Sequence, residues 1–115
     1  MSLTRNLITA LVLLACAGTL SAAPHGDVEA GKTKSATCQA CHGADGNTTI
    51  DGSYPKLAGQ YATYLAKALH DYKSGERKNA IMAGFAATLS EQDIADLAAY
   101  FASQTGDIKD LSHLK

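Results

Sequence analysis

Apolar side chains recur at helical spacing in three stretches of the chain, and nowhere with the two-residue period of a β-strand. The clearest stretch is residues 60–74, where apolar positions follow one another at i, i+3 and i+4 and Gly75 supplies a stop. We expect its three tyrosines to belong to the core rather than to a ligand site. The expected buried face of this helix consists of Tyr61, Tyr64, Leu65, Ala68, Leu69 and Tyr72.

Residues 28–38 form the second helical stretch, with Asp27 placed as its N-cap. Gly31 lies inside this stretch, where glycine costs stability relative to alanine. We therefore expect another helix to approach the backbone closely at Gly31, and simple tolerance of the glycine is the alternative. The expected face of this helix consists of Val28, Gly31, Ser35 and Cys38.

The third helical stretch begins at Ser90, which forms the capping-box pattern with Asp93, and is expected to end at Gly106. Leu89 and Ile94 flank its start with the spacing of a hydrophobic staple. This is a strong helix start, because two independent local signals coincide. The expected buried face consists of Ile94, Leu97, Ala98 and Phe101.

Two irregular segments separate the helical stretches. Residues 43–59 contain the turn dipeptides Asp45-Gly46 and Asp51-Gly52, which predict a loop. A loop of this length in a small domain is usually functional or folded over a ligand. Residues 76–89 show a mixed pattern and contain Met82, the only methionine besides the initiator.

The first 23 residues differ from the rest in composition. A short segment with one positive charge, Arg5, precedes the apolar run of residues 7–20, and small residues follow at Ser21-Ala22-Ala23. This layout is typical of a secretory signal peptide, and the apolar run is short for a membrane span. We expect a signal peptide over residues 1–23 and one domain over residues 24–115.

The processing of this leader has two interpretations. Cleavage after Ala23 leaves Pro24 directly beyond the cut, which is an unfavourable neighbour. Leu13-Leu14-Ala15-Cys16 resembles a bacterial lipobox, in which the cysteine is lipidated and becomes the new N-terminus. The first interpretation predicts a periplasmic protein with no membrane span after processing, and the second predicts a lipoprotein anchored through Cys16.

The stretch Cys38-Gln39-Ala40-Cys41-His42 carries the C-x-x-C-H signature of covalent haem attachment. On a helical turn the two cysteines face the same way, so both thiols can form thioethers with vinyl groups along one edge of a porphyrin. His42 can then offer an imidazole nitrogen to the iron. A covalently held haem would also stabilise a domain of this size, which buries only a modest fraction of its surface.

Two other kinds of site contain a C-x-x-C pair. A closed zinc site needs four protein ligands, and the chain has no second cysteine pair. A thioredoxin-like redox pair lies in a βαβ unit, and the chain shows no strand pattern. Haem is therefore the preferred interpretation, and the second axial ligand of its iron is predicted to be Met82, since His25 and His113 lie near the chain ends.

Together these features resemble a class I cytochrome c. The similarity is greatest to the small exported bacterial branch whose domains also occur as tandem di-haem carriers. It covers essentially the whole of residues 24–115, and it implies an all-α fold in which three main helices surround one covalently attached haem. The residues that carry it are Gly31-Lys32, residues 38–43, residues 54–60, residues 71–75, Met82 and residues 97–101.

The resemblance assigns a role to each candidate site residue. Cys38 and Cys41 would carry the two thioethers, and His42 and Met82 would bind the iron as axial ligands. Pro55 would accept a hydrogen bond from the ring of His42 through its carbonyl group, which fixes the orientation of the ligand.

The resemblance also places the crossing of the N-terminal and C-terminal helices. Gly31 would lie at this crossing, close to Leu97 and Tyr100. Ser35 stands where relatives often carry a bulkier side chain, so we expect a looser crossing here.

We expect an electron carrier rather than an enzyme, since an iron with His and Met ligands has no vacant position for a substrate. The expected donor is a dehydrogenase or a quinol-oxidising complex, and the expected acceptor is a terminal oxidase or a reductase. A permanently docked electron-transfer subunit of such an enzyme is one alternative. A haem-based gas sensor, in which a small ligand displaces Met82, is the other.

The charge of the chain bears on these partners. The formal net charge of −1 gives no indication of a nucleic-acid partner. Residues 32–78 hold seven Lys or Arg against four acids, whereas residues 79–115 hold two against five. This asymmetry indicates either ordinary solvated faces or a weakly basic docking surface for an acidic redox partner.

Overall fold

The computed structural model describes residues 21–108, which form helices and contain no strand. The helical class expected from the sequence is thereby confirmed. Most of the expected leader, including Cys16, lies outside the described residues, as does His113. The helices are α1 (Val28–Lys34), α2 (Ala36–His42), α3 (Ala62–Ser74), α4 (Ala80–Ala86) and α5 (Glu91–Ser103).

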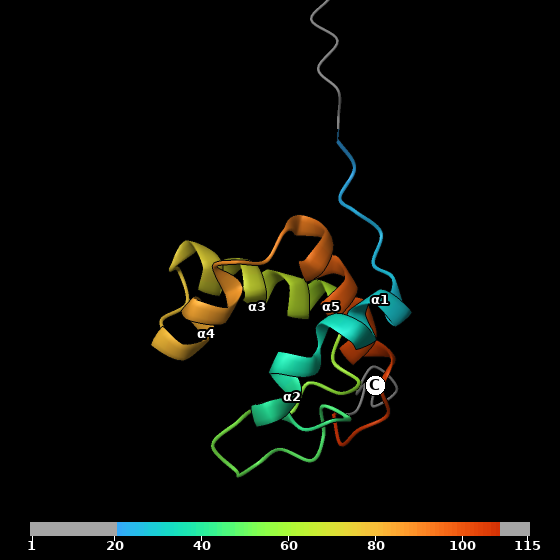
Figure 1. Ribbon diagram of the computed structural model, residues 1–115, viewed down its shortest axis with the longest axis vertical. Helices are drawn as coiled ribbons and strands as arrows, with labels where there is room; N and C mark the ends of the chain where they lie inside the picture. The colour runs from blue at the N-terminus through green and yellow to red at the C-terminus, as the bar shows by residue number, and fades with distance from the viewer. Residues whose placement is uncertain (1–20, 109–115) are drawn as a thin grey trace, which may run out of the picture.

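Helix α5 is the centre of the fold, because α1 and α3 both pack against it (Figure 1). The predicted capping box is present: the Ser90 hydroxyl accepts the Asp93 N–H, and the Asp93 carboxylate accepts the Ser90 N–H. The helix ends at Ser103 rather than at Gly106. Its buried residues are Ile94, Asp96, Leu97, Ala98, Tyr100 and Phe101, which include the whole predicted apolar face.

The close approach expected at Gly31 is confirmed. A Cβ atom at this position would lie 2.0 Å from the carbonyl oxygen of Asp96 and 2.7 Å from the Cβ of Tyr100. Glycine is therefore required where α1 crosses α5, since no larger residue fits against a neighbouring backbone. The nearest atoms belong to Asp96 and Tyr100, whereas the expectation named Leu97 and Tyr100.

The predicted helix over residues 28–38 is divided at Ser35 into α1 and α2. Ser35 is fully buried, and its hydroxyl donates to the carbonyl oxygen of Lys32 at 2.7 Å and accepts a hydrogen bond from the Gln39 side chain at 2.7 Å. Such side-chain bonds compete with the backbone ladder of a helix. Residues 38–42 therefore belong to a short helix of their own, α2, which follows the crossing of α1 and α5.

A buried carboxylate ties the chain before α1 to α5. Asp96 accepts hydrogen bonds from the Asp27 N–H at 2.8 Å, the Lys34 ammonium at 2.6 Å and the Gln92 side-chain amide at 2.8 Å. Lys34 also lies 2.8 Å from Asp93, so one cation bridges two acids of α5. These donors, the Lys34 ammonium first, lower the pKa of Asp96.

Helix α3 begins at Ala62, after Tyr61, and ends at Ser74. The next residue, Gly75, adopts a left-handed backbone conformation with φ of 84°. The prediction that its tyrosines belong to the core is wrong for Tyr61 and Tyr64, which are 59% and 50% exposed, whereas Tyr72 is half-buried. Only Leu65 of this helix is buried.

The mixed segment of residues 76–89 contains α4, a helix of seven residues that packs against α3. Asn79 is its N-cap. No helix in the part of the chain described here is both long enough and apolar enough to cross a membrane.

Candidate functional site

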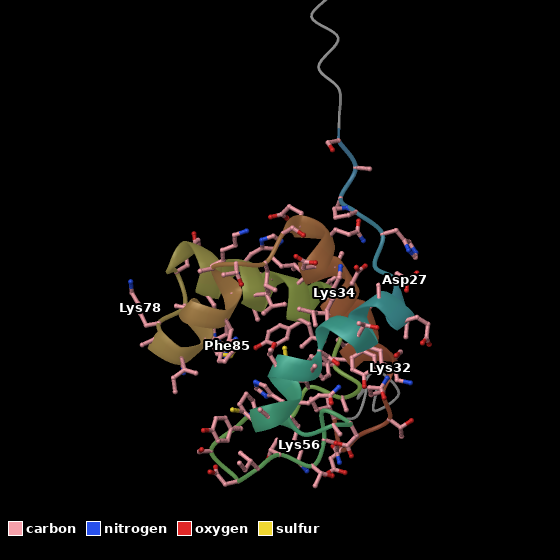
Figure 2. The ribbon with its side chains drawn as sticks, viewed as in Figure 1. Asp27, Lys32, Lys34, Lys56, Lys78 and Phe85 are labelled. Atoms are coloured by element: carbon pink, nitrogen blue, oxygen red, sulfur yellow. The ribbon has the colours of Figure 1, made fainter. Side chains whose placement is uncertain are left out.

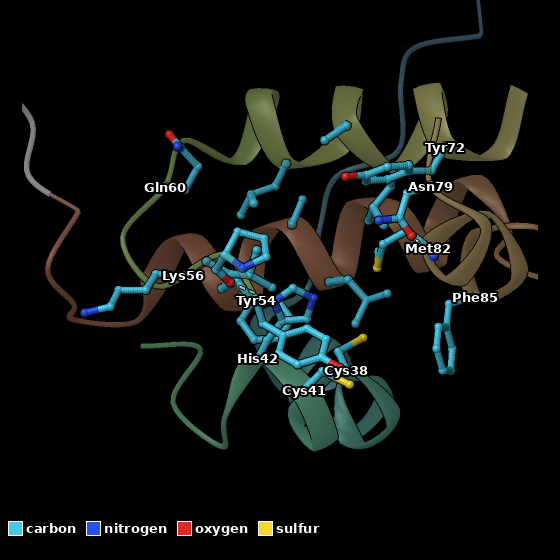
Figure 3. Close-up of a pocket in the computed structure, with 18 of the residues that line it drawn as sticks. Cys38, Cys41, His42, Tyr54, Lys56, Gln60, Tyr72, Asn79, Met82 and Phe85 are labelled. Atoms are coloured by element: carbon cyan, nitrogen blue, oxygen red, sulfur yellow. Dashed lines mark hydrogen bonds between the residues drawn. The ribbon is translucent and has the colours of Figure 1, made fainter. Parts of the chain in front are cut away.

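A cavity of about 440 Å³ lies between α2, α3, α4 and α5 and is closed on one side by residues 53–57 (Figure 3). This volume is in the range of pockets that hold small molecules and cofactors. The deep part of the wall is apolar, so a flat apolar group would be shielded from water there. The apolar side chains that line it include Leu57, Leu65, Ala68, Leu69, Leu97, Ala98 and Phe101.

Helix α2 brings both cysteines and the histidine of the C-x-x-C-H sequence to this cavity. Cys38 and Cys41 lie one helical turn apart and are both free, half-buried thiols. Burial raises the pKa of the Cys38 thiol. The geometry expected for two thioethers on one edge of a porphyrin is therefore available, because both thiols line the same wall.

The ring of His42 is held by the loop that follows α2. Its Nδ1 lies 2.8 Å from the carbonyl oxygen of Pro55, and the residue is only 6% exposed. The ring of Tyr54 meets the imidazole edge to face, with the ring centroids 6.4 Å apart. Because Nδ1 donates to Pro55, Nε2 is the nitrogen that remains for a metal.

Met82 reaches the same cavity from α4. Figure 3 shows Met82 on the α4 side of the cavity and Cys38, Cys41 and His42 on the α2 side. The structure thus brings together two segments that are 40 positions apart in the sequence. Of the other ligands considered from the sequence, His25 lies in the segment before α1 and does not line this cavity. His113 is outside the described residues.

The residues present fit a haem group. Two thiols, an imidazole nitrogen and a thioether sulfur border one largely apolar cavity. Among the residues described, no three His, Cys, Asp or Glu side chains are placed to hold a metal ion by themselves. The donor set therefore suits a metal that arrives already bound in a porphyrin, and the chain would supply thioethers and axial ligands.

Several residues that border the cavity were not predicted to belong to the site. Tyr64 and Tyr72 line it from α3, which explains why these side chains on the apolar face are not buried in the core. Arg77 lies over the ring of Tyr72, 4.9 Å from its centroid, and Asn79 precedes α4. Of these, Asn79 carries a local signal: an N-cap residue three positions before Met82.

His70 is a half-buried histidine of α3. Its Nε2 lies 3.3 Å from the carboxylate of Glu91, so it joins α3 to the start of α5. The residue lies away from the cavity wall.

The chain matches the Cytochrome c family over residues 28–105. Cytochrome c4 of Pseudomonas aeruginosa is 51% identical over 98 residues, which cover 85% of this chain and 47% of that protein. Cytochrome c-554(548) of Halomonas halodenitrificans is 49% identical over 82 residues, which cover 69% of this chain and 98% of that protein. The crystal structure of reduced recombinant cytochrome c4 from Pseudomonas stutzeri superimposes with a TM-score of 0.67 at 48% identity, over 72% of this chain and 48% of that chain.

The chain spans about half the length of the cytochromes c4 that it matches. A "Thiosulfate dehydrogenase electron acceptor" of Thiomonas intermedia is also similar, with 42% identity over 69 residues, 60% of this chain and 32% of that protein.

Proposed function

Because the family match spans residues 28–105, the chain belongs to the cytochrome c family, and we propose that it carries single electrons between redox partners through one haem. The observation that carries this proposal is the cavity that brings Cys38, Cys41, His42 and Met82 together. In the proposal, Cys38 and Cys41 hold the haem covalently. His42 and Met82 bind its iron, and Pro55 orients His42.

Haem bound in this way supplies reversible Fe(II)/Fe(III) chemistry, and Met/His ligation raises its potential. The chain's own residues influence both the potential and the rearrangement that accompanies electron transfer. The thioether of Met82 and the apolar wall both disfavour the additional positive charge of the oxidised state. The hydrogen bond from His42 to Pro55 keeps the imidazole in one orientation, so little has to rearrange when the charge changes.

One haem follows from one attachment sequence, because C-x-x-C-H occurs once in the chain. The similarity to cytochrome c-554(548) supports a protein built from a single domain of this kind, since the chain covers 98% of that protein. The similarity to cytochrome c4 covers only about half of each relative, so the number of haems, one, is proposed for this chain alone.

For the proposed docking surface, the ion pairs of the basic residues considered from the sequence are relevant. Lys34, Lys56 and Lys67 each pair with an acid, so they contribute little net positive charge. Lys78 is exposed and has no ion pair among the described residues.

We define the α4 surface as Arg77, Lys78, Ile81 and Phe85. Ile81 is 59% exposed and Phe85 is 48% exposed, and both border the mouth of the cavity. Figure 2 shows Lys78 and Phe85 at the same end of the molecule, away from Lys32 and Lys34. An apolar patch beside two cations suits a partner with an apolar contact bordered by acids, and this is the proposed site of electron exchange.

The proposed donor is a dehydrogenase or a quinol-oxidising complex, and the proposed acceptor is a terminal oxidase or a reductase. The similarity to a thiosulfate dehydrogenase electron acceptor supports a dehydrogenase as donor. A permanently docked subunit of such an enzyme would use the same site and the same surface. The proposed location is the periplasm, reached through the leader over residues 1–23, with lipidation at Cys16 as the alternative.

The proposal is tested on the purified holoprotein by the red-edge absorption band that reports an Fe(III)–Met bond. The wild type is expected to show this band and to bind no carbon monoxide in the reduced state. Met82→Ala is expected to lose the band, bind carbon monoxide and have a lower reduction potential. A wild type without the band, or a Met82→Ala protein with unchanged ligand binding, would refute the proposed ligation.

A further inference from the structure

Asn79 directly precedes α4, the short helix that carries Met82. It has an extended backbone, and its side-chain oxygen accepts a hydrogen bond from the Met82 N–H at 3.0 Å. Met82 occupies the third position of the helix, which is the position whose N–H an N-cap side chain commonly satisfies. One hydrogen bond therefore joins the cap of the helix to the backbone of the candidate ligand.

The helix has few other restraints at this end. It contains seven residues, of which only Ala86 is buried, and Ala86 lies at the opposite end. Helices of this length do not persist without caps or tertiary contacts. Among the described helices, α4 packs against α3 alone.

The C-terminal end of α4 has its own restraints. The Ala87 N–H donates to the Ala83 carbonyl, the Leu89 N–H donates to the Ala86 carbonyl, and the Lys73 ammonium of α3 donates to the Leu89 carbonyl. The first two bonds complete the last turn of the helix, and the Lys73 bond joins this end to α3. At the end where Met82 lies, the Asn79 side-chain bond acts together with one backbone bond, from the Ala83 N–H to the Asn79 carbonyl.

We propose that Asn79 is a positioning residue for Met82, in that its cap bond fixes the backbone from which the thioether reaches into the cavity. This inference rests on the proposed ligation by Met82. Asn79 also borders the cavity, so the cap and the candidate ligand belong to one wall. Without the cap, the first turn of α4 frays and the fraction of molecules with Met82 withdrawn increases.

The expected size follows from the ordinary cost of removing an N-cap side chain, which corresponds to about a fivefold change in an equilibrium constant. A competing ligand reports this fraction, because its apparent affinity increases in proportion to the population of the open state. We expect Asn79→Ala holoprotein to bind exogenous imidazole about fivefold more tightly than wild type. Asn79→Ser, which keeps a capping oxygen, should stay within about twofold of wild type.

Ser90→Ala provides the matched control. Ser90 is the N-cap of α5, and its side chain accepts the Asp93 N–H, so its loss removes an equivalent bond from a helix that carries no candidate ligand. Ser90→Ala should lower thermal stability as Asn79→Ala does, while its imidazole affinity and red-edge band remain those of wild type. Amide exchange of Met82 in the holoprotein gives a second measurement, and it should be faster in Asn79→Ala only.

The outcomes separate the two proposals. If Met82→Ala and wild type bind imidazole equally well, ligation by Met82 fails, whatever Asn79 does. If Met82→Ala binds imidazole more tightly but Asn79→Ala equals wild type in both imidazole affinity and Met82 amide exchange, the positioning role is overturned. An equal change in Ser90→Ala would also overturn it, because the effect would then be general destabilisation.

Discussion

The imidazole Nδ1 of His42 lies 2.8 Å from the carbonyl oxygen of Pro55, so the last residue of α2 is fixed by the loop that follows it. The acceptor is a backbone oxygen, so a side-chain substitution at position 55 cannot remove it. What proline contributes is a fixed φ angle, which limits the directions in which the carbonyl can point.

Pro55→Gly is therefore expected to loosen the orientation of His42 without removing its acceptor. The free energy of unfolding should decrease by about 1 kcal/mol, because the unfolded chain gains freedom at this position. Exchange of the Nδ1 proton with solvent should become faster, as measured by NMR on the holoprotein. Pro55→Ala should give an intermediate rate, and an unchanged rate in both variants would show that proline has no orienting role.

Gly31→Ala should be strongly destabilising. The added Cβ would lie 2.0 Å from the Asp96 carbonyl oxygen, and a backbone atom cannot move aside without displacing α5. We expect a loss of about 3 kcal/mol in thermal or denaturant unfolding.

Gly84→Ala is the control for this substitution. Gly84 also lies within a helix, but a Cβ there would meet nothing within 4 Å. Alanine should stabilise the protein by about 0.5–1 kcal/mol, because it restricts the unfolded chain and favours the helix. Equal effects of the two substitutions would contradict the close crossing of α1 and α5.

Most features of the fold that sequence analysis predicted correctly depend on contacts within a few residues, and the close approach at Gly31 is the exception. The capping box of Ser90 and Asp93 and the shared face of Cys38 and Cys41 both follow from helical geometry alone. The break at Ser35 was not predicted, because it depends on whether a serine hydroxyl turns back to the Lys32 carbonyl.

The tyrosines of α3 show why the site was only partly predicted. Tyr64 lies on the apolar face of its helix, and periodicity cannot distinguish a face that packs on protein from one that borders a cavity. Buried Asp96 was also missed, because its burial depends on Lys34 and Asp27, which are distant in sequence. The roles of Cys38, Cys41, His42, Pro55 and Met82 stay predictions, although the structure places all five around one cavity.

We call Asp96 and its donors Lys34, Gln92 and the Asp27 N–H the Asp96 cluster. This cluster predicts a decrease in stability at low pH. Hydrogen bonds from Lys34 and the Asp27 N–H lower the pKa of Asp96 below its ordinary value of 3.8. A carboxylate with a lowered folded-state pKa stabilises the fold above its unfolded pKa, and this stabilisation is lost as the pH falls below about 4. The free energy of unfolding should therefore decrease below pH 4, as measured by urea titration.

Asp96→Asn should cost about 2 kcal/mol at neutral pH, because charge-assisted hydrogen bonds are replaced by weaker ones. It should also reduce the pH dependence below pH 4. Glu76→Gln, which changes an exposed carboxylate with no ion pair among the described residues, serves as the control. If the free energy of unfolding depended on pH identically in wild type and Asp96→Asn, this result would contradict the role of the cluster.

The α4 surface predicts where an acidic partner docks. Lys78→Gln should slow electron transfer to such a partner by about twofold at low ionic strength, and added salt should reduce this difference. Lys67→Gln, which removes the same charge, should have a smaller effect, because Lys67 is not part of the α4 surface. Stopped-flow measurements over a range of salt concentrations test this, and a larger effect of Lys67→Gln would place the docking site elsewhere.

The central claim is a single haem with both axial positions filled, which exchanges one electron. A spectroelectrochemical titration of the wild-type holoprotein, with and without carbon monoxide, tests it most directly. We predict one reversible one-electron transition per chain, with a midpoint potential that carbon monoxide does not change. Two transitions, or a potential raised by carbon monoxide, would contradict the claim, because they would show a second haem or an open position on the reduced iron.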